Sequence, residues 1–113
     1  MMSSILIVED NESLGKSLGA FLRGHGLDVS HAESLYDARA HLDGSSFDAV
    51  VLDVGLPDGS GLELLERTGT ERAVVMTATP NEADFAHHGV THFLPKPFDL
   101  EDLLRALRDV VEA

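Results

Sequence analysis

Short apolar runs that each end in acidic residues are the feature that most constrains this fold. The run Ile5–Val8 is followed by Glu9 and Asp10, and the run Ala49–Leu52 is followed by Asp53. Short stretches of β-branched and aliphatic residues with polar breaks at both ends are typical of strands buried on both faces of a parallel sheet. The sequence therefore predicts an α/β protein in which carboxylates follow two buried strands.

Strand-like and helix-like segments alternate along the whole chain. Strands are expected at 4–8, 28–32, 49–52, 73–77 and 91–94, and helices at about 12–25, from 34 to the turn at 44–46, at 62–67, at 79–88 and from 99 onward. The last helix has the clearest apolar stripe, formed by Leu100, Leu103, Leu104, Leu107, Val110 and Val111. Short connections between alternating elements predict one domain, residues 1–113, with a parallel sheet covered by helices on both faces.

Polar side chains are expected to gather at one edge of this sheet. The carboxyl ends of parallel strands meet at the same edge, where open α/β sheets place their binding sites. Glu9, Asp10 and Asp53 would lie close together there and would repel each other without a cation. Lys96, which follows the apolar stretch Val90–Leu94, is one candidate cation. The group of acids indicates a divalent metal as a second.

Composition excludes several classes of function. The chain has 20 Asp and Glu against 8 Lys and Arg, a formal charge of -12, which disfavours direct binding to nucleic acid. Because it has no Cys, disulfides and thiolate metal sites are excluded. It has no apolar segment of membrane-spanning length and no basic, apolar leader at Met1–Ser4. A cytoplasmic location without membrane contact is expected.

Taken in order, the strand-end residues resemble those of the receiver domain of two-component response regulators. The markers are Glu9-Asp10, Asp53, Leu56-Pro57, Gly61, Thr77 and Lys96-Pro97. The resemblance extends from Ile5 to Val111 and implies a flavodoxin-like, doubly wound sheet of five parallel strands in the order 2-1-3-4-5, with five helices. The stretch from Thr77 to Lys96 is shorter than in the family by about one helical turn. The fourth helix is therefore expected to be shortened.

The resemblance implies phosphorylation of Asp53. Its carboxylate would take a phosphoryl group from a phosphohistidine of a sensor histidine kinase or a phosphotransfer protein. Mg²⁺, a hard cation that prefers oxygen ligands, would be bound directly by Asp10 and Asp53, by Glu9 largely through water, and by the backbone carbonyl of Gly55. These roles are those of a receiver that catalyses its own phosphorylation, not of a turnover enzyme.

Residues on the last two strands are implied to respond to that phosphorylation. The Lys96 ammonium and the Thr77 hydroxyl would contact the phosphoryl oxygens. Phe93 stands where the family carries its switch aromatic, and would turn inward and alter the surface formed by the fourth helix, the fifth strand and the fifth helix. That surface is also a possible homodimer interface. The Lys96–Pro97 peptide bond is expected to be cis.

Two positions predict a long-lived phosphorylated state. Gly55 and Thr79 stand two residues after Asp53 and Thr77, where the family controls the lifetime of the aspartyl phosphate. Neither side chain is an acid or an amide that could position an attacking water. Slow self-dephosphorylation is therefore expected.

Two other functions use a similar set of residues. A haloacid-dehalogenase-like phosphatase also uses an Asp nucleophile with Mg²⁺, but it needs a larger chain and a second Asp where this chain has Gly55. A pseudo-receiver that binds partners without phosphorylation is the remaining alternative. No output domain, which in this family is often DNA-binding, is expected within these 113 residues. The chain is either a stand-alone regulator or the receiver part of a longer protein.

Overall fold

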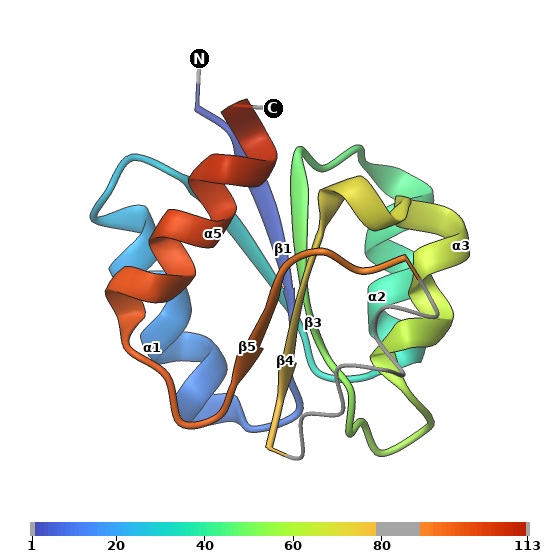
Figure 1. Cartoon of the computed structure of the whole chain (residues 1–113). Coiled ribbons are helices and arrows are strands. Elements are labelled where there is room, and N and C mark those ends of the chain that lie inside the picture. The colour runs from blue at the N-terminus through green and yellow to red at the C-terminus, as the bar shows by residue number, and fades with distance from the viewer. Residues whose placement is uncertain (1, 79–88, 113) are drawn as a thin grey trace.

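Five parallel strands form one sheet in the computed structural model, which describes residues 2–78 and 89–112 (Figure 1). The strands are β1 (Ser4–Val8), β2 (Asp28–Ala32), β3 (Ala49–Asp53), β4 (Ala73–Thr77) and β5 (Phe93–Pro95). Their order in the sheet is β2-β1-β3-β4-β5, and every pairing is parallel. The predicted fold class and strand order are therefore confirmed.

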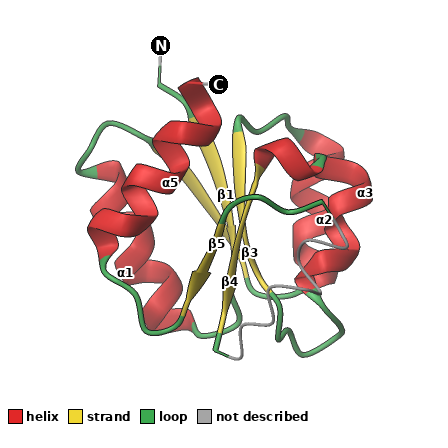
Figure 2. Ribbon diagram, in the orientation of Figure 1, coloured by secondary structure: helices red, strands yellow, loops and turns green. Residues whose placement is uncertain are grey.

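Helices cover both faces of the sheet (Figure 2). Over the described residues the α-helices are α1 (Glu12–Arg23), α2 (Leu35–Gly44), α3 (Leu65–Thr68) and α5 (Leu100–Glu112), with 3-10 helices η1 (Gly61–Leu64) and η2 (Thr70–Arg72) on either side of α3. Helices α1 and α5 lie on one face, and α2 and α3 lie on the other. The shortened fourth helix expected at 79–88 lies outside the described residues.

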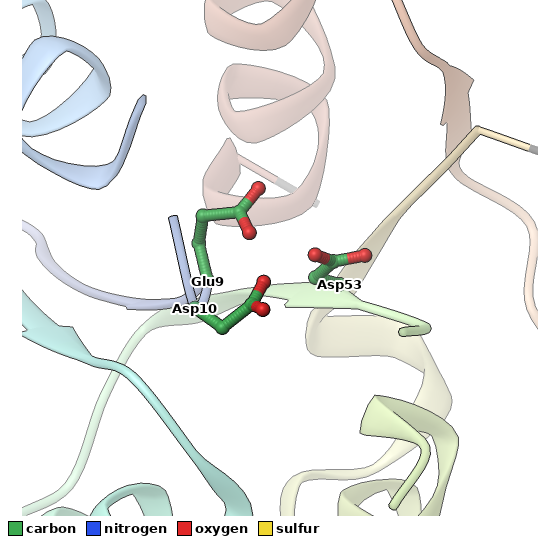
Figure 3. Close-up of side chains that lie close together, drawn as sticks. All are labelled: Glu9, Asp10 and Asp53. Atoms are coloured by element: carbon green, nitrogen blue, oxygen red, sulfur yellow. The ribbon is translucent and has the colours of Figure 1, made fainter. Parts of the chain in front are cut away.

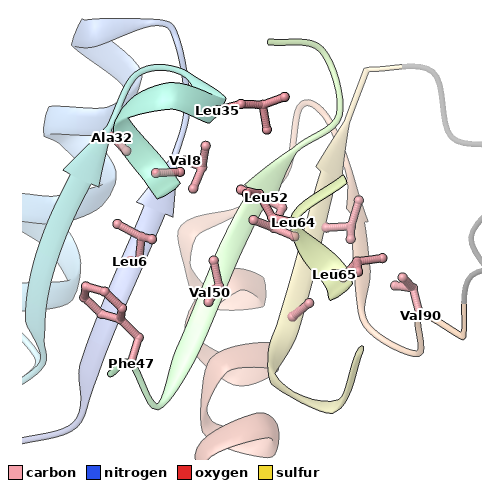
Figure 4. Packing of buried hydrophobic residues seen from close by; sticks show 13 residues of the cluster. Leu6, Val8, Ala32, Leu35, Phe47, Val50, Leu52, Leu64, Leu65 and Val90 are labelled. Carbon is pink, nitrogen blue, oxygen red and sulfur yellow. The ribbon is translucent and has the colours of Figure 1, made fainter. Parts of the chain in front are cut away.

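The central strands β1, β3 and β4 are buried almost throughout because helices pack on both of their faces, whereas the edge strands β2 and β5 are only partly buried. Successive residues of β1 and β3 alternate between two apolar clusters, one on each side of the sheet. The cluster beneath α2 and α3 is shown in Figure 4 and contains Leu6, Val8, Ala32, Leu35, Ala38, Phe47, Val50, Leu52, Leu64, Leu65, Ala73, Val75 and Val90. The opposite cluster includes Ile5, Ile7, Leu18, Leu22, Val51, Val74, Met76, Leu103 and Leu107. This explains why β1 and β3 are continuous apolar runs and not alternating ones.

Side-chain caps fix where α1 and α2 begin. The Asn11 side chain accepts a hydrogen bond of 3.0 Å from the Leu14 N–H, and the Ser34 hydroxyl accepts one of 3.1 Å from the Asp37 N–H. These side chains satisfy donors that an α-helix leaves unpaired at its start. The cap at Ser34 agrees with the predicted start of this helix. The α1 start matters for function because it directly follows Glu9 and Asp10.

Four predicted details were wrong. Helix α1 ends at Arg23 and not at His25, because Gly24 caps it and Gly26 turns the chain with a φ of 82°. The third helix begins as the 3-10 helix η1 at Gly61 because a capping box between Ser60 and Glu63 starts the turn there. It ends at Thr68, where Gly69, whose φ is 81°, caps it.

The other two concern the end of the chain. Strand β5 begins at Phe93 and not at Thr91, since its pairing with β4 starts at Phe93 opposite Val75. Leu100, predicted to be in the apolar stripe of α5, is 37% exposed and is the first residue of the helix. Buried side chains of the stripe begin at Leu103.

Candidate functional site

The ends of β1 and β3 bring three carboxylates together. Strand pairing sets Val8 beside Leu52, so Glu9, Asp10 and Asp53 follow at adjacent points of the same edge. One carboxylate oxygen from each lies within 4.8 Å of the other two (Figure 3). Glu9 is 1% exposed and Asp53 is 6% exposed, whereas Asp10 is exposed to solvent. This is the oxygen-rich cluster that the sequence predicted.

Lys96 joins two of these carboxylates. Its Nζ donates to Glu9 Oε1 at 2.6 Å and to Asp53 Oδ2 at 3.2 Å. The lysine is brought to the site by the end of β5, where the Lys96 N–H donates to the Thr77 carbonyl oxygen at 2.6 Å. The Lys96–Pro97 peptide bond is cis, the isomer that the family resemblance implies. An ammonium group shared by two buried acids partly neutralises their repulsion.

Burial strongly perturbs the Glu9 carboxyl group. Desolvation, together with the neighbouring Asp53, raises its pKa to about 7, although the hydrogen bonds from Lys96 and from the Asn11 N–H work in the opposite direction. The Asn11 N–H lies 3.2 Å from Glu9 Oε2. For Lys96, burial alone would lower the pKa, but the hydrogen bonds and charges of Glu9 and Asp53 raise it overall. The lysine therefore stays positively charged.

The loop after β3 is folded tightly against Asp53. The Gly55 N–H donates to Asp53 Oδ1 at 3.2 Å, so both oxygens of this carboxylate have a donor. Gly61 is buried, and a Cβ there would overlap with the backbone carbonyl of Asp53. Only glycine permits this approach without displacing the chain that carries the carboxylate.

Thr77 and Phe93 lie on the neighbouring strands, as expected. Thr77 is the last residue of β4, is 3% exposed and pairs with Pro95 of β5. Phe93 is half-buried and packs against the apolar cluster beneath α2 and α3. The structure thus brings Glu9, Asp10, Asp53 and Lys96 into one group at the carboxyl edge of the sheet. Thr77 ends the strand beside Asp53, whose pairing partner is Met76.

Sequence reasoning missed two residues near this site. The His31 ring Nε2 lies 2.8 Å from the Glu9 carbonyl oxygen. The Asp58 carboxylate accepts the N–H groups of Leu35 and Tyr36 at 2.9 and 3.1 Å, which ties the loop after Asp53 to the start of α2. Neither contact leaves a pattern in the sequence, because both join segments more than twenty residues apart.

Comparison with known proteins identifies the family. A sequence model of the response regulator receiver domain matches residues 5–108. The chain belongs to this family. This receiver domain is therefore a signalling module of two-component response regulators.

Several individual proteins resemble this receiver domain. The KDP operon transcriptional regulatory protein KdpE of Escherichia coli (strain K12) is 33% identical over 113 residues, which cover 95% of this chain and 50% of KdpE. The non-phosphorylated HemR receiver domain from Leptospira biflexa has a TM-score of 0.85 at 31% identity, covering 98% of this chain and 95% of that one. The chain thus spans half the length of the curated relative and nearly all of the solved receiver.

A third similar structure contains ligands. It is a response regulator protein from Burkholderia pseudomallei with a phosphorylated aspartic acid, a calcium ion and citrate. It has a TM-score of 0.84 at 25% identity, covering 97% of this chain and 69% of that one.

Within residues 2–78 and 89–112 of this receiver domain, none of the helices has the length and apolar character needed to cross a membrane.

Proposed function

We propose that this receiver domain accepts a phosphoryl group on Asp53 from a phosphohistidine of a sensor histidine kinase or a phosphotransfer protein. The observation that carries this proposal is the position of the Asp53 carboxylate. It receives Lys96 Nζ and the Gly55 N–H, each at 3.2 Å, and lies beside two further acids. The phosphorylated aspartic acid in the similar Burkholderia pseudomallei protein supports the same chemistry.

The reaction needs a nucleophile and charge neutralisation, and no general base. An Asp53 carboxylate oxygen attacks the phosphorus atom, a P–O bond forms, and the P–N bond to the donor imidazole breaks. The departing imidazole nitrogen takes up a proton, and Asp53 carries a mixed acyl phosphate. Attack by an anion on an anionic group is opposed by repulsion, so positive charge at the site governs the rate.

The donor set fits Mg²⁺. Three carboxylate oxygens within 4.8 Å of one another provide the hard oxygen ligands that this ion prefers. Because so few protein ligands are present, the ion would keep several bound waters, as Mg²⁺ usually does. Asp10 and Asp53 would bind it directly, with Glu9 largely through water and Gly55 through its backbone carbonyl. The ion when bound would neutralise charge on the phosphoryl oxygens.

Lys96 and Thr77 would hold the transferred group. Without a phosphoryl group, Lys96 donates to Glu9 and Asp53, and its Nζ lies 3.2 Å from Asp53 Oδ2. Movement of one of these hydrogen bonds onto a phosphoryl oxygen keeps the lysine paired with an anion throughout. The Thr77 hydroxyl, at the end of the strand adjacent to Asp53, would donate to another phosphoryl oxygen.

The output of this step would be a change of surface and not a released product. Phe93 lies on β5, three residues before Lys96, and would turn inward when Thr77 moves toward the phosphoryl group. The surface concerned consists of the fourth helix, β5 and α5, of which residues 79–88 lie outside the described structure. Homodimerisation through that surface, and slow loss of the phosphoryl group beside Gly55 and Thr79, stay predictions; Thr79 also lies outside the described residues.

Acetyl phosphate tests the proposal without a cognate kinase. The wild type, Asp53→Asn and Asp28→Asn would each be incubated with acetyl phosphate, with and without Mg²⁺, and weighed intact by mass spectrometry. Asp28 is an exposed aspartate at the amino end of β2, away from the site, and is the matched control. The expected result is one phosphoryl group, dependent on Mg²⁺, on the wild type and on Asp28→Asn alone.

The alternative pseudo-receiver predicts another result. A domain that binds partners without phosphorylation would gain no mass under any of these conditions. Equal modification of the wild type and Asp53→Asn would instead show that the phosphoryl group goes elsewhere and would refute the role of Asp53.

A further inference from the structure

The end of β2 holds both backbone polar groups of Glu9. The Glu9 N–H donates to the Ala32 carbonyl at 2.9 Å, which extends the parallel ladder one step beyond the Val8–Ala32 pair. The next ladder group is the Glu9 carbonyl, and β2 has ended by that point. The His31 side chain takes its place, with Nε2 2.8 Å from that oxygen. Because a carbonyl only accepts, Nε2 is the donor and carries the hydrogen.

Helix α1 makes room for this ring at Gly15. The residue is buried in the second turn of α1, and a Cβ built on it would overlap with the Cε1 and Nε2 atoms of His31. Any larger residue at Gly15 must therefore push the ring away from the Glu9 carbonyl. A glycine inside a helix lowers its stability relative to alanine. Glycine at position 15 thus lowers the stability of α1, and the space needed by the His31 ring explains why it is there.

Glycine is not required at every such position of this helix. Gly19 lies one turn further along α1 and is also buried, but a Cβ there would meet only ordinary contacts, the nearest at 3.4 Å from Arg23. The close approach is therefore specific to Gly15 and His31.

We propose that His31 is a positioning residue for the Glu9–Asp10 turn, and that Gly15 is the small residue that admits its ring. The turn carries two of the three clustered carboxylates. Rotation of the peptide group between Glu9 and Asp10 would move the Glu9 side chain away from Lys96 and would also move Asp10. By donating to the Glu9 carbonyl, His31 holds that peptide in one orientation. The proposal deepens the proposed function, since the turn it fixes is the one assigned to bind Mg²⁺.

A double-mutant cycle in the metal-free domain tests the arrangement itself. Gly15→Ala, His31→Ala and the double variant would be unfolded in urea without divalent ions. Alone, Gly15→Ala should lower the unfolding midpoint because the methyl displaces the ring. In the His31→Ala background the same change should raise it, since the space is free and alanine favours the helix by about fivefold in the folding equilibrium constant. Equal effects in both backgrounds would overturn the proposal.

The cycle stays informative even when one variant folds poorly. Should Gly15→Ala alone fail to fold, recovery of folding in the double variant is the expected result, and failure of both would count against the shared space. The ring itself can also be followed by nitrogen NMR. The wild type should show a His31 Nε2–H protected from exchange, and Gly15→Ala should lose it.

Mg²⁺ affinity tests the positioning role. Calorimetric titration with MgCl₂ should give binding about fivefold weaker for His31→Ala and for Gly15→Ala, the value of one lost neutral hydrogen bond. The double variant should bind no more weakly than either. His31→Gln, whose amide N–H can still donate, should recover most of the affinity, and Gly19→Ala should match the wild type. Unchanged affinity in His31→Ala would overturn the role.

Failure of this proposal differs from failure of the proposed function. If the wild type takes up phosphoryl on Asp53 while His31→Ala binds Mg²⁺ equally well, only the positioning role is wrong. If no variant is modified on Asp53, the proposed function fails. The sign of the Gly15→Ala effect in the two backgrounds still reports whether His31 occupies that space.

Discussion

The Lys96 ammonium group lies closer to Glu9 than to Asp53, at 2.6 Å against 3.2 Å. In the metal-free domain the lysine therefore chiefly neutralises the most deeply buried acid and only secondarily contacts the proposed nucleophile. This arrangement makes Glu9 and Lys96 an electrostatic pair whose balance changes when another cation or a phosphoryl group enters. The first three predictions follow from it.

Replacement of Lys96 by Met should leave two buried carboxylates without a cation. We expect the free energy of unfolding at pH 7.5 without Mg²⁺ to fall by about 2 kcal/mol, because an unpaired buried charge is costly. Phosphorylation by acetyl phosphate should also slow by more than about tenfold. Lys16→Met is the control, since Lys16 pairs with Glu12 at the surface and should leave both quantities unchanged. Urea unfolding and intact mass provide the two readings.

Glu9→Gln should change how stability depends on pH. The Glu9 pKa is raised from 4.5 to about 7, so between these values the folded domain binds more protons than the unfolded chain. Stability of the metal-free wild type should therefore fall as pH rises through this interval, by about 3 kcal/mol at the most. In Glu9→Gln this loss should disappear.

Urea unfolding at pH 5, 6, 7 and 8 would measure the difference between these two proteins. Glu66→Gln, which changes an exposed glutamate on α3, should keep the wild-type dependence. A wild-type curve parallel to that of Glu9→Gln would mean that Glu9 titrates normally.

Mg²⁺ should stabilise the folded domain through the acidic cluster. At a free concentration ten times Kd, mass action predicts about 1.4 kcal/mol of added stability, seen as a higher Tm. Asp10→Asn removes one of the three clustered carboxylates and should reduce the increase strongly. Asp28→Asn should retain it, because that residue lies at the other end of the strands. An equal increase in all three proteins would place the ion elsewhere.

Gly61→Ala should disturb the backbone that carries Asp53. The added methyl would overlap with the backbone carbonyl of the buried residue Asp53. We expect a loss of about 2 kcal/mol in the free energy of unfolding, in the range of an overpacked core. Gly44→Ala is the matched control, because a Cβ at Gly44 meets nothing within 4 Å. Comparable losses in both variants would point to a general effect of glycine replacement.

The strands and the acidic edge could be predicted because their signals are local. Strands β1, β3 and β4 each contain a short apolar run, and the residues at the carboxyl ends of parallel strands fall at the same edge of the sheet. The run before Asp53 therefore predicted both β3 and its carboxylate. The start of the third helix was also present locally, since Ser60 and Glu63 form the spacing of a capping box, which the sequence interpretation overlooked.

The choice of partners within the site could not be predicted in this way. That Lys96 contacts Glu9 more closely than Asp53, or that His31 meets Gly15, depends on register and on distances between segments far apart in sequence. No periodicity records such contacts. The exposure of Leu100 could not be predicted either. An apolar stripe indicates which face of a helix is buried, but not where along the helix the neighbouring sheet ends.

Chemical mapping of the modified residue tests the central claim most directly. After reaction with acetyl phosphate and Mg²⁺, borohydride reduces an aspartyl phosphate to homoserine, which tandem mass spectrometry locates in the peptide that spans β3. We predict homoserine at position 53 in the Mg²⁺-treated wild type and none without Mg²⁺. Homoserine at position 10, or at any acid other than Asp53, would contradict this prediction.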